Sequence, residues 1–353
     1  MGGAGAYTLG YGCKEVDDAV HQAIGAGNGS SLRCAEEIYL AEKLIELHPW
    51  ADRVRLAVSC EGARALAIHI ARAASGKKEV VVCSGEGSSA AAQTMRTALG
   101  DALRIPNNDL SALQALIQGH AIGVIWMDFA HDGLPEQGFL ERVRALARAN
   151  GIVLIYDECA TGFRQTFGGL HKLHAVEPDL AIFGKALGNG YSIAATIGRL
   201  SVMEAGQTSF DCGTGEASRI GPVAALETLR TMQQVESWEQ ISAIGNVITR
   251  QWQILAQRYG LKISMHGLSA LAKFSIVSPN ASAYEVLIKQ EMLGKGLLAG
   301  TGVCVCTAHV PEVTNQYFEA LEPAFALIAQ CEAGRDVAAL LAGRNGRDER
   351  RAD

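Results

Sequence analysis

Two side chains of opposite charge follow two apolar segments of this 353-residue chain. Asp157 is the first charged residue after the β-branched, apolar run IVLIY at 152–156, and Lys185 comes shortly after the run LAIF at 180–183. Continuous apolar runs of this kind are typical of strands buried on both faces of a parallel sheet. Open α/β sheets bind ligands at the carboxyl ends of their strands, so we expect both side chains to serve one site.

The chemistry that suits this pair is that of pyridoxal 5'-phosphate (PLP). A lysine amine can form a Schiff base with the cofactor aldehyde, and a buried carboxylate can keep the pyridine nitrogen protonated so that the ring withdraws electrons. Glycines at 184, 188 and 190 leave little side-chain bulk around Lys185, which should let a flat ring approach the backbone. Alone, the lysine would be read as a surface charge and the aspartate as a turn cap. The prediction therefore depends on the pair.

The segment that carries both residues resembles the class III PLP-dependent aminotransferases, and most closely the glutamate-1-semialdehyde aminomutase branch. In the order of the family motif it contains LIYDECATGFR at 154–164, Gly168 and Gly169, Pro178 and Asp179, Gly184 and Lys185, and Gly198 and Arg199. Weaker similarity extends from about residue 9 to residue 329. The resemblance implies an α/β protein with the type I fold of PLP-dependent transferases: a mostly parallel central sheet with helices on both faces, and a smaller α+β C-terminal domain.

The resemblance also implies roles for single residues. Lys185 would be the Schiff-base lysine and general base, Asp157 would pair with the pyridinium nitrogen, and Cys159 would pack under the ring, although it also suits a small buried hydrophobic position. Thr214 stands where the family has a threonine that reaches the PLP phosphate of the neighbouring subunit, although it could be a simple loop hydroxyl. This correspondence implies a homodimer with its active sites at the subunit interface.

The chain departs from the family pattern around the cofactor. The phosphate loop, about NSGTEA in the family, reads VSCEGA at 58–63. Ser59, Cys60 and Glu61 could still bind phosphate through main-chain N–H groups at a helix N-terminus. The carboxylate of Glu61, however, should repel the phosphate and weaken cofactor binding.

Two further departures concern the ring and the substrate pocket. The turn at 84–89 reads SGEGSS and lacks the aromatic residue that stacks on the ring in the family. The chain also begins near the point where the N-terminal segment of the family ends, so we expect part of the substrate pocket to be missing.

The altered turn matches a rival pattern, because GEGSSA at 85–90 fits the dinucleotide-binding motif G-x-G-x-x-G/A. That motif requires an acidic residue at the end of the next strand. Asp109 instead follows Pro106 and two asparagines, and we expect it to cap a helix over 110–118. A nicotinamide cofactor is therefore disfavoured.

Composition limits the remaining possibilities. The net charge of −6 and the lack of a basic tract argue against a nucleic-acid partner. The sequence has no uncharged apolar run of about 18 residues or more and no signal-peptide pattern, so we expect a cytoplasmic protein that does not engage a membrane. Nine cysteines without CxxC spacing predict reduced, buried thiols rather than a zinc site.

Hydrophobic periodicity predicts alternating helices and strands. We expect helices at 35–48, 63–74 and 139–149, strands at 54–58, 79–83, 122–127, 152–156, 180–183 and 193–197, a long helical stretch at 221–259, and then a strand at 271–277, a helix at 282–295, a strand at 304–308 and a helix at 314–331. The predicted division is an N-terminal segment (1–33), a large PLP-binding domain (34–213), a small domain (214–340) and a disordered tail (341–353).

The main hypothesis is a PLP-dependent aminotransferase or aminomutase that transfers an amino group between small molecules through Lys185. An alternative is a PLP-dependent racemase or epimerase that uses the same lysine, Lys185. The departures from the family pattern around the cofactor also favour a second hypothesis, in which the protein is a non-catalytic partner subunit. The substrate does not follow from the sequence; Arg64, His131, Arg164 and Arg219 are candidate contacts for it, though each also suits a structural role.

Overall fold

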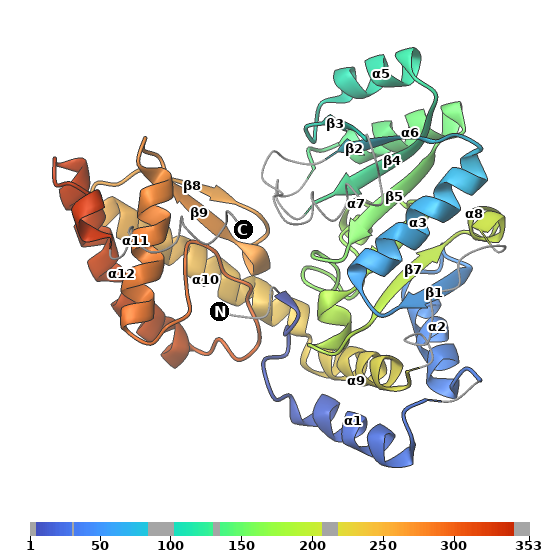
Figure 1. Ribbon diagram of the computed structural model, residues 1–353, viewed down its shortest axis with the longest axis horizontal. Helices are drawn as coiled ribbons and strands as arrows, with labels where there is room; N and C mark the ends of the chain where they lie inside the picture. The colour runs from blue at the N-terminus through green and yellow to red at the C-terminus, as the bar shows by residue number, and fades with distance from the viewer. Residues whose placement is uncertain (1–4, 30–31, 84–101, 130–134, 207–217, 342–353) are drawn as a thin grey trace, which may run out of the picture. The chain divides into compact units, whose positions relative to one another are not determined.

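The computed structural model describes residues 5–29, 32–83, 102–129, 135–206 and 218–341 (Figure 1). They form two compact units, the larger ending at Ile241 and the smaller beginning at Ser242. None of the helices in these ranges is both long enough and apolar enough to cross a membrane. Asp157 and Lys185, the two residues proposed to carry the chemistry, both belong to the larger unit.

A seven-stranded sheet is the centre of the larger unit. Its order is β1-β7-β6-β5-β4-β2-β3. Only β7 is antiparallel to its neighbours, and the other adjacent pairs are parallel. The strands are β1 (Arg53–Ala57), β2 (Glu79–Cys83), β3 (Leu103–Ile105), β4 (Ile122–Asp128), β5 (Val153–Glu158), β6 (Leu180–Phe183) and β7 (Ala194–Gly198). Six of them confirm predicted strands to within two residues at each end, and the mostly parallel α/β architecture is as expected.

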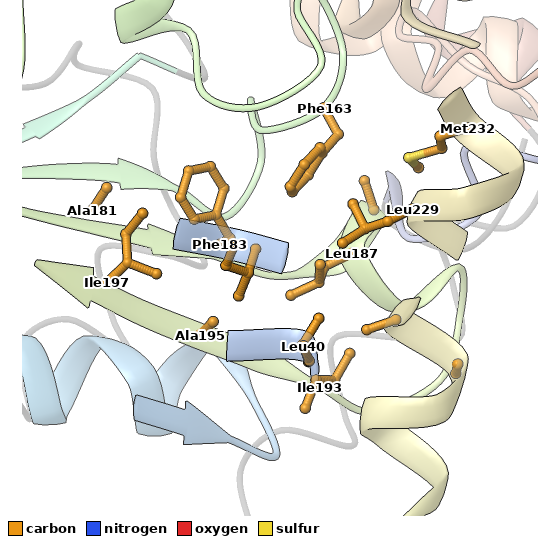
Figure 2. Packing of buried hydrophobic residues seen from close by; sticks show 14 of the residues in the cluster. Leu40, Phe163, Ala181, Phe183, Leu187, Ile193, Ala195, Ile197, Leu229 and Met232 are labelled. Carbon is orange, nitrogen blue, oxygen red and sulfur yellow. The ribbon is translucent and has the colours of Figure 1, made fainter. Parts of the chain in front are cut away.

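Helices cover both faces of this sheet. They are α1 (Lys14–Ala26), α2 (Ala35–Leu47), α3 (Cys60–Ser75), α5 (Leu110–Gly119), α6 (Phe139–Asn150), α7 (His171–His174), α8 (Leu200–Met203) and α9 (Ile220–Val235). α3 buries Ala67 and Ile70 in a cluster with Trp126 and Ile182 on one face. On the other face Leu40 and Leu229 pack in a cluster with Phe183 and Ile197 (Figure 2). Successive residues of β6 thus serve opposite faces, as the pleat of a strand requires.

Three helix ends matter for the argument. α3 begins at Cys60 rather than at residue 63, because the Ser59 hydroxyl accepts the main-chain N–H of Gly62 and caps the helix. Asp109 caps α5 in the same way and confirms the helix predicted there. The long helical stretch predicted at 221–259 is two helices, since Glu236 takes a left-handed conformation (φ 48°) and ends α9 before α10 (Ser237–Arg258) begins.

α9 packs against α1 and α2 and therefore belongs to the larger unit. The two units consequently divide inside α10, whereas the sequence placed the division at 213/214. The predicted boundary lies among residues outside the described ranges and stays a prediction.

The smaller unit contains the antiparallel strands β8 (Ile263–His266) and β9 (Lys273–Ile276), with α11 (Ala281–Gly294) and α12 (Pro311–Glu332). Residues 304–308 are not a strand, contrary to the expectation. Val303 and Val305 are buried, and their N–H groups donate to the carbonyls of Ala272 and Ala270, but the pairing does not extend into a regular ladder. The apolar alternation there indicates burial, not strand pairing.

The packing of α9 generates a stability prediction. Leu229→Ala should lower the free energy of unfolding by about 2–5 kcal/mol, because Leu229 is fully buried and its truncation leaves a cavity. Val235→Ala on the same helix should change it by less than about 0.5 kcal/mol, because Val235 is 39% exposed. Urea unfolding followed by circular dichroism measures both. Equal losses would contradict the assignment of α9 to this core.

Candidate active site

Asp157 and Lys185 lie at the ends of neighbouring strands. Asp157 is the second-last residue of β5. Lys185 is the second residue after the end of β6, with Gly184 between them. In the parallel pairing of these strands Asp157 is opposite Ile182, and Glu158 is opposite Phe183. Adjacent strands are about 4.8 Å apart, so the backbone brings the two residues to one edge near the middle of the sheet.

The backbone at Lys185 is unusual. Its φ of 45° lies in the left-handed region, and it begins the short 3₁₀ helix Lys185–Gly188. A non-glycine residue in this conformation costs on the order of 1–3 kcal/mol and persists only when its surroundings impose it, which occurs most often at functional sites. The strain therefore supports a function for this lysine beyond surface charge.

The glycines around Lys185 make room for protein atoms. A Cβ built on Gly184 would lie 2.5 Å from the sulfur of Cys60, and one on Gly188 would lie 2.7 Å from a side-chain carbon of Ile193. At Gly190, whose φ is 104°, a Cβ would lie 2.2 Å from the Tyr7 ring. Each of these positions therefore requires glycine because a neighbouring side chain packs against its backbone.

Asp157 forms a buried ion pair with Arg64. Its Oδ2 accepts the Nε–H of Arg64 at 2.7 Å, and its Oδ1 accepts the main-chain N–H of Cys159 at 3.1 Å. The carboxylate side chain is 1% exposed and the arginine side chain 9%. Although burial disfavours the charged guanidinium, the facing carboxylate raises the pKa of Arg64 above its ordinary value. Of the two roles that the sequence offered for Arg64, substrate contact and structural group, the ion pair with Asp157 supports the structural one.

The VSCEGA loop opens α3, with Ser59 as its cap and Cys60 and Glu61 as its first two residues. The first N–H groups of a helix lack partners within the helix and attract anions. The side chain of Glu61 is 53% exposed and lies 3.8 Å from the Nη1 of Arg64. Arg64 thus stands close to two carboxylates, with Asp157 at 2.7 Å and Glu61 at 3.8 Å.

The sulfur atoms of Cys60 and Cys159 lie beside the same glycine, because a Cβ built on Gly184 would be 2.5 Å from the first and 3.6 Å from the second. The neighbouring Cys159 lowers the pKa of Cys60 against the effect of burial; Arg64 and Lys185 lower it further, whereas the Asp157 carboxylate raises it. Burial and the Cys60 neighbour raise the pKa of Cys159. Five residues therefore form one electrostatic group, which we call the Asp157 cluster: Cys60, Arg64, Asp157, Cys159 and Lys185.

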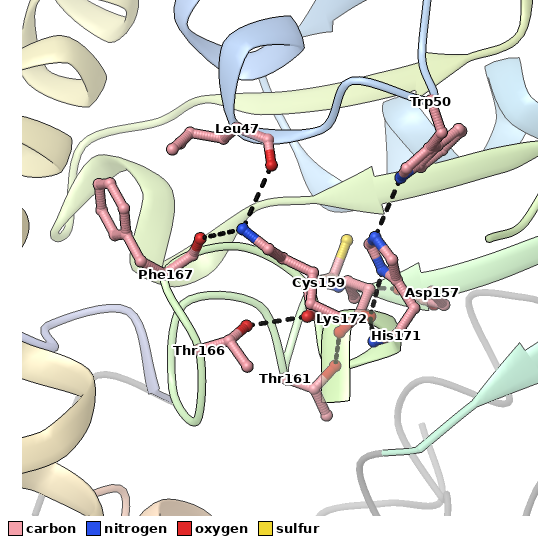
Figure 3. A network of polar contacts seen from close by, with 11 residues as sticks. Leu47, Trp50, Asp157, Cys159, Thr161, Thr166, Phe167, His171 and Lys172 are labelled. Atoms are coloured by element: carbon pink, nitrogen blue, oxygen red, sulfur yellow. Dashed lines mark hydrogen bonds and ion pairs between the residues drawn. The ribbon is translucent and has the colours of Figure 1, made fainter. Parts of the chain in front are cut away.

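A second buried network surrounds Glu158, the residue after Asp157 (Figure 3). Its carboxylate accepts the Thr161 hydroxyl at 2.5 Å and the Nδ1–H of His171 at 3.1 Å. Trp50 donates its Nε1–H to the Nε2 of His171, so the imidazole is neutral with its proton on Nδ1. Burial alone would raise the pKa of Glu158, but these hydrogen bonds outweigh it and lower that pKa. The network holds the end of β5 in place.

The other candidates divide into two groups. Thr214, His131 and the turn at 84–89 lie outside the described residues. Arg164 donates its Nε–H to the Ala160 carbonyl at 2.6 Å and also bonds the Gly5 carbonyl, which ties the N-terminal segment to the motif. Arg219 forms an ion pair with Glu36. The structure thus gives both arginines a structural role.

Comparison with known proteins gives a family match. Residues 131–317 match the family model described as Aminotransferase class-III. The chain is 28% identical over 298 residues to a 3-aminobutyryl-CoA aminotransferase of Cloacimonas acidaminovorans, covering 80% of this chain and 72% of that protein. It is 32% identical over 259 residues to a glutamate-1-semialdehyde 2,1-aminomutase of Methanothermobacter thermautotrophicus, covering 65% of this chain and 60% of that protein.

Solved structures show the same fold. The FumI protein of Sphingopyxis sp. MTA144, in its PLP internal aldimine form, has a TM-score of 0.84 at 21% identity and covers 95% of this chain and 85% of its own. An omega-transaminase from Sphaerobacter thermophilus has a TM-score of 0.77 at 24% identity, with coverages of 93% and 85%. At such identities the likeness establishes the fold.

The buried ion pair can be tested by breaking it. Arg64→Met should lower the free energy of unfolding by about 3–5 kcal/mol, because it leaves the Asp157 carboxylate buried without its partner. The double variant Arg64→Met with Asp157→Asn should recover most of that loss, because no buried charge remains. Chemical denaturation measures both.

The matched control is Arg230→Met, which removes an exposed arginine from its ion pair with Glu227. That change should cost no more than about 1 kcal/mol. If the single Arg64 variant is as stable as this control, the ion pair is not a structural constraint of the site.

Proposed function

The chain belongs to the class III aminotransferase family, and we propose that it is a PLP-dependent enzyme that moves an amino group, either between two molecules or within one. The observation that carries this proposal is the arrangement of Asp157 and Lys185 at the ends of β5 and β6. The packing of the sheet does not by itself explain why Lys185 takes a left-handed backbone conformation, or why Asp157 forms a buried ion pair at the same sheet edge.

The side chains of the site fit PLP in kind. Lys185 provides a primary amine for the aldehyde, Asp157 a buried carboxylate for the pyridine nitrogen, and the first turn of α3 main-chain N–H groups for the phosphate. When bound, PLP supplies a ring that withdraws electrons from the substrate carbon. Arg64 is the exception, because a guanidinium close to Asp157 competes with a protonated ring nitrogen for the same carboxylate.

Each residue then has a proposed task. The Nζ of Lys185 would hold the cofactor covalently and, when free, would take a proton from the substrate carbon and return it elsewhere. Asp157 would stabilise positive charge at the ring nitrogen, and its hydrogen bond with Arg64 holds that carboxylate in position. Cys159 would pack under the ring, while Ser59, Cys60 and Glu61 would bind the phosphate through the main chain. Thr214, which lies outside the described residues, is proposed from the family resemblance to bind the phosphate of the neighbouring subunit.

The site where Lys185 returns the proton determines the reaction. Return to the cofactor side gives amino transfer, and return to the opposite face of the same substrate carbon gives racemisation or epimerisation. Two of the relatives are named for a CoA-linked amine and for an amino aldehyde, so the shared feature that we infer for the substrate is a primary amine on a small molecule. A cytoplasmic location stays a prediction from the sequence.

We also infer a homodimer. Support comes from large apolar side chains that are exposed within a short stretch before and along α2, including Leu32 (77%), Ile38 (56%) and Tyr39 (56%). Exposed apolar side chains that gather in one region often mark an interface between subunits.

The lysine assignment has a direct spectroscopic test. Addition of PLP to the wild-type protein should produce the visible absorbance band of a covalent lysine–cofactor linkage, and borohydride should attach the cofactor to the peptide that contains Lys185. Lys185→Ala should lose the band and lower turnover by at least roughly 10²–10⁴-fold, because the base that moves the proton is gone. Lys172→Ala, which removes an exposed lysine of the same unit, should keep the band. A band that survives in Lys185→Ala would overturn the assignment.

A second candidate function is a non-catalytic partner subunit. It is favoured by the engagement of Asp157 with Arg64 and by the acidic residue in the phosphate loop. The purified protein, loaded with PLP and given amino donors, should nevertheless convert one of them at about 1 per second or faster if it is an enzyme of ordinary efficiency. Absence of conversion by the pure protein, together with a rise in the activity of a catalytic relative when this protein is added, would favour the partner role.

A further inference from the structure

Two cysteines from distant parts of the chain meet at the edge of the Asp157 cluster. Cys60 begins α3, and Cys159 directly follows β5. A Cβ built on Gly184 would lie 2.5 Å from the sulfur of Cys60 and 3.6 Å from the sulfur of Cys159, so both sulfur atoms lie beside the same glycine. The absence of a side chain at Gly184 makes room for the Cys60 sulfur at this place.

The two thiols differ in exposure and in charge environment. Cys60 is half-buried and lies in the field of Arg64 and Lys185, which favour its thiolate, and of Asp157, which opposes it. Cys159 is 1% exposed, and burial raises its pKa. Thiolates are the nucleophiles in thiol–disulfide exchange, so Cys60 is the residue that can attack first. Cys159 is placed to attack second, from inside the protein.

Other half-buried thiols of the chain have the opposite environment. Cys13 lies beside Glu15 and Cys34 beside Glu37, and burial together with these carboxylates raises the pKa of both thiols. They match Cys60 in exposure class but not in charge, which makes them internal controls for its reactivity.

We propose that Cys60 and Cys159 are a reversible redox pair that closes to a disulfide when the protein meets an oxidised low-molecular-weight disulfide. The Cys60 thiolate attacks one sulfur of that molecule, forms a mixed disulfide and releases the other half as a thiolate. Cys159 then gives up its proton to the departing group and attacks the Cys60 sulfur, which releases the second half as a thiol. The two cysteines lose two electrons, and the small disulfide gains them.

The disulfide would act on the cofactor site. It joins the first turn of α3 to the end of β5, beside the main chain that leads to Lys185. On the basis of the proposed function, this bond restrains the N–H groups that bind the phosphate and the side chain that lies under the ring. The oxidised protein should therefore bind PLP more weakly than the reduced protein.

The test uses the reduced full-length protein, treated under native conditions with oxidised glutathione, blocked with N-ethylmaleimide and mapped by peptide mass spectrometry. The expected product is a peptide pair linked through Cys60 and Cys159. In Cys159→Ala the glutathione adduct should accumulate on Cys60, and in Cys60→Ala Cys159 should stay unmodified. Circular dichroism of each variant checks that it is folded.

Rates give a second measure that needs no variant. Iodoacetamide should modify Cys60 several-fold faster than Cys13 or Cys34 near neutral pH, because the pKa of Cys60 is lowered and the pKa values of the other two thiols are raised. Equal rates, or glutathione treatment that links other cysteines or none, would overturn the redox pair.

PLP titration of the reduced and oxidised proteins then separates this inference from the proposed function. A linked pair with unchanged PLP affinity would overturn the coupling to the cofactor site and leave the redox pair standing. A linked pair in a protein that never binds PLP would refute the proposed function alone.

Discussion

The buried ion pair between Asp157 and Arg64 is the constraint on which the rest of the site depends. A carboxylate at the end of a central strand is costly unless a charge and hydrogen bonds compensate it. Here the guanidinium of α3 and the main-chain N–H of Cys159 do so. The pair therefore fixes the position of α3 over the sheet edge. It also brings the positive charge of Arg64 close to Cys60 and Glu61. The VSCEGA loop itself contains no positively charged residue.

Asp157 and Glu158 are consecutive, but they take part in different networks. Successive side chains of a strand point to opposite faces, so one faces α3 and the other faces Trp50 and His171. The network around Glu158 is neutral apart from the carboxylate and is fully enclosed. It holds the end of β5 in place. Asp157, on the opposite face of the same strand end, therefore keeps a fixed position.

Several features of the fold followed from the sequence for definite reasons. The strands 79–83 and 180–183 were recognisable because buried parallel strands are continuous apolar runs, and Asp109 was recognisable as a helix cap because its side chain acts on its own neighbours. The failures have a common cause. Residues 304–308 and the stretch 221–259 were assigned from local periodicity, but a strand needs a partner and a helix can end at one left-handed residue.

The sequence by itself determined the order of the elements, the family resemblance and the presence of a lysine and an aspartate at neighbouring strand ends, because these depend on periodicity and on a motif of contiguous residues. Only the tertiary structure decided that Arg64 pairs with Asp157, that Cys60 and Cys159 lie beside Gly184 and that this glycine makes room for the Cys60 sulfur. These contacts join segments almost one hundred residues or more apart. Which side chains meet across such a separation depends on the packing of α3 against the sheet, for which local sequence carries no signal.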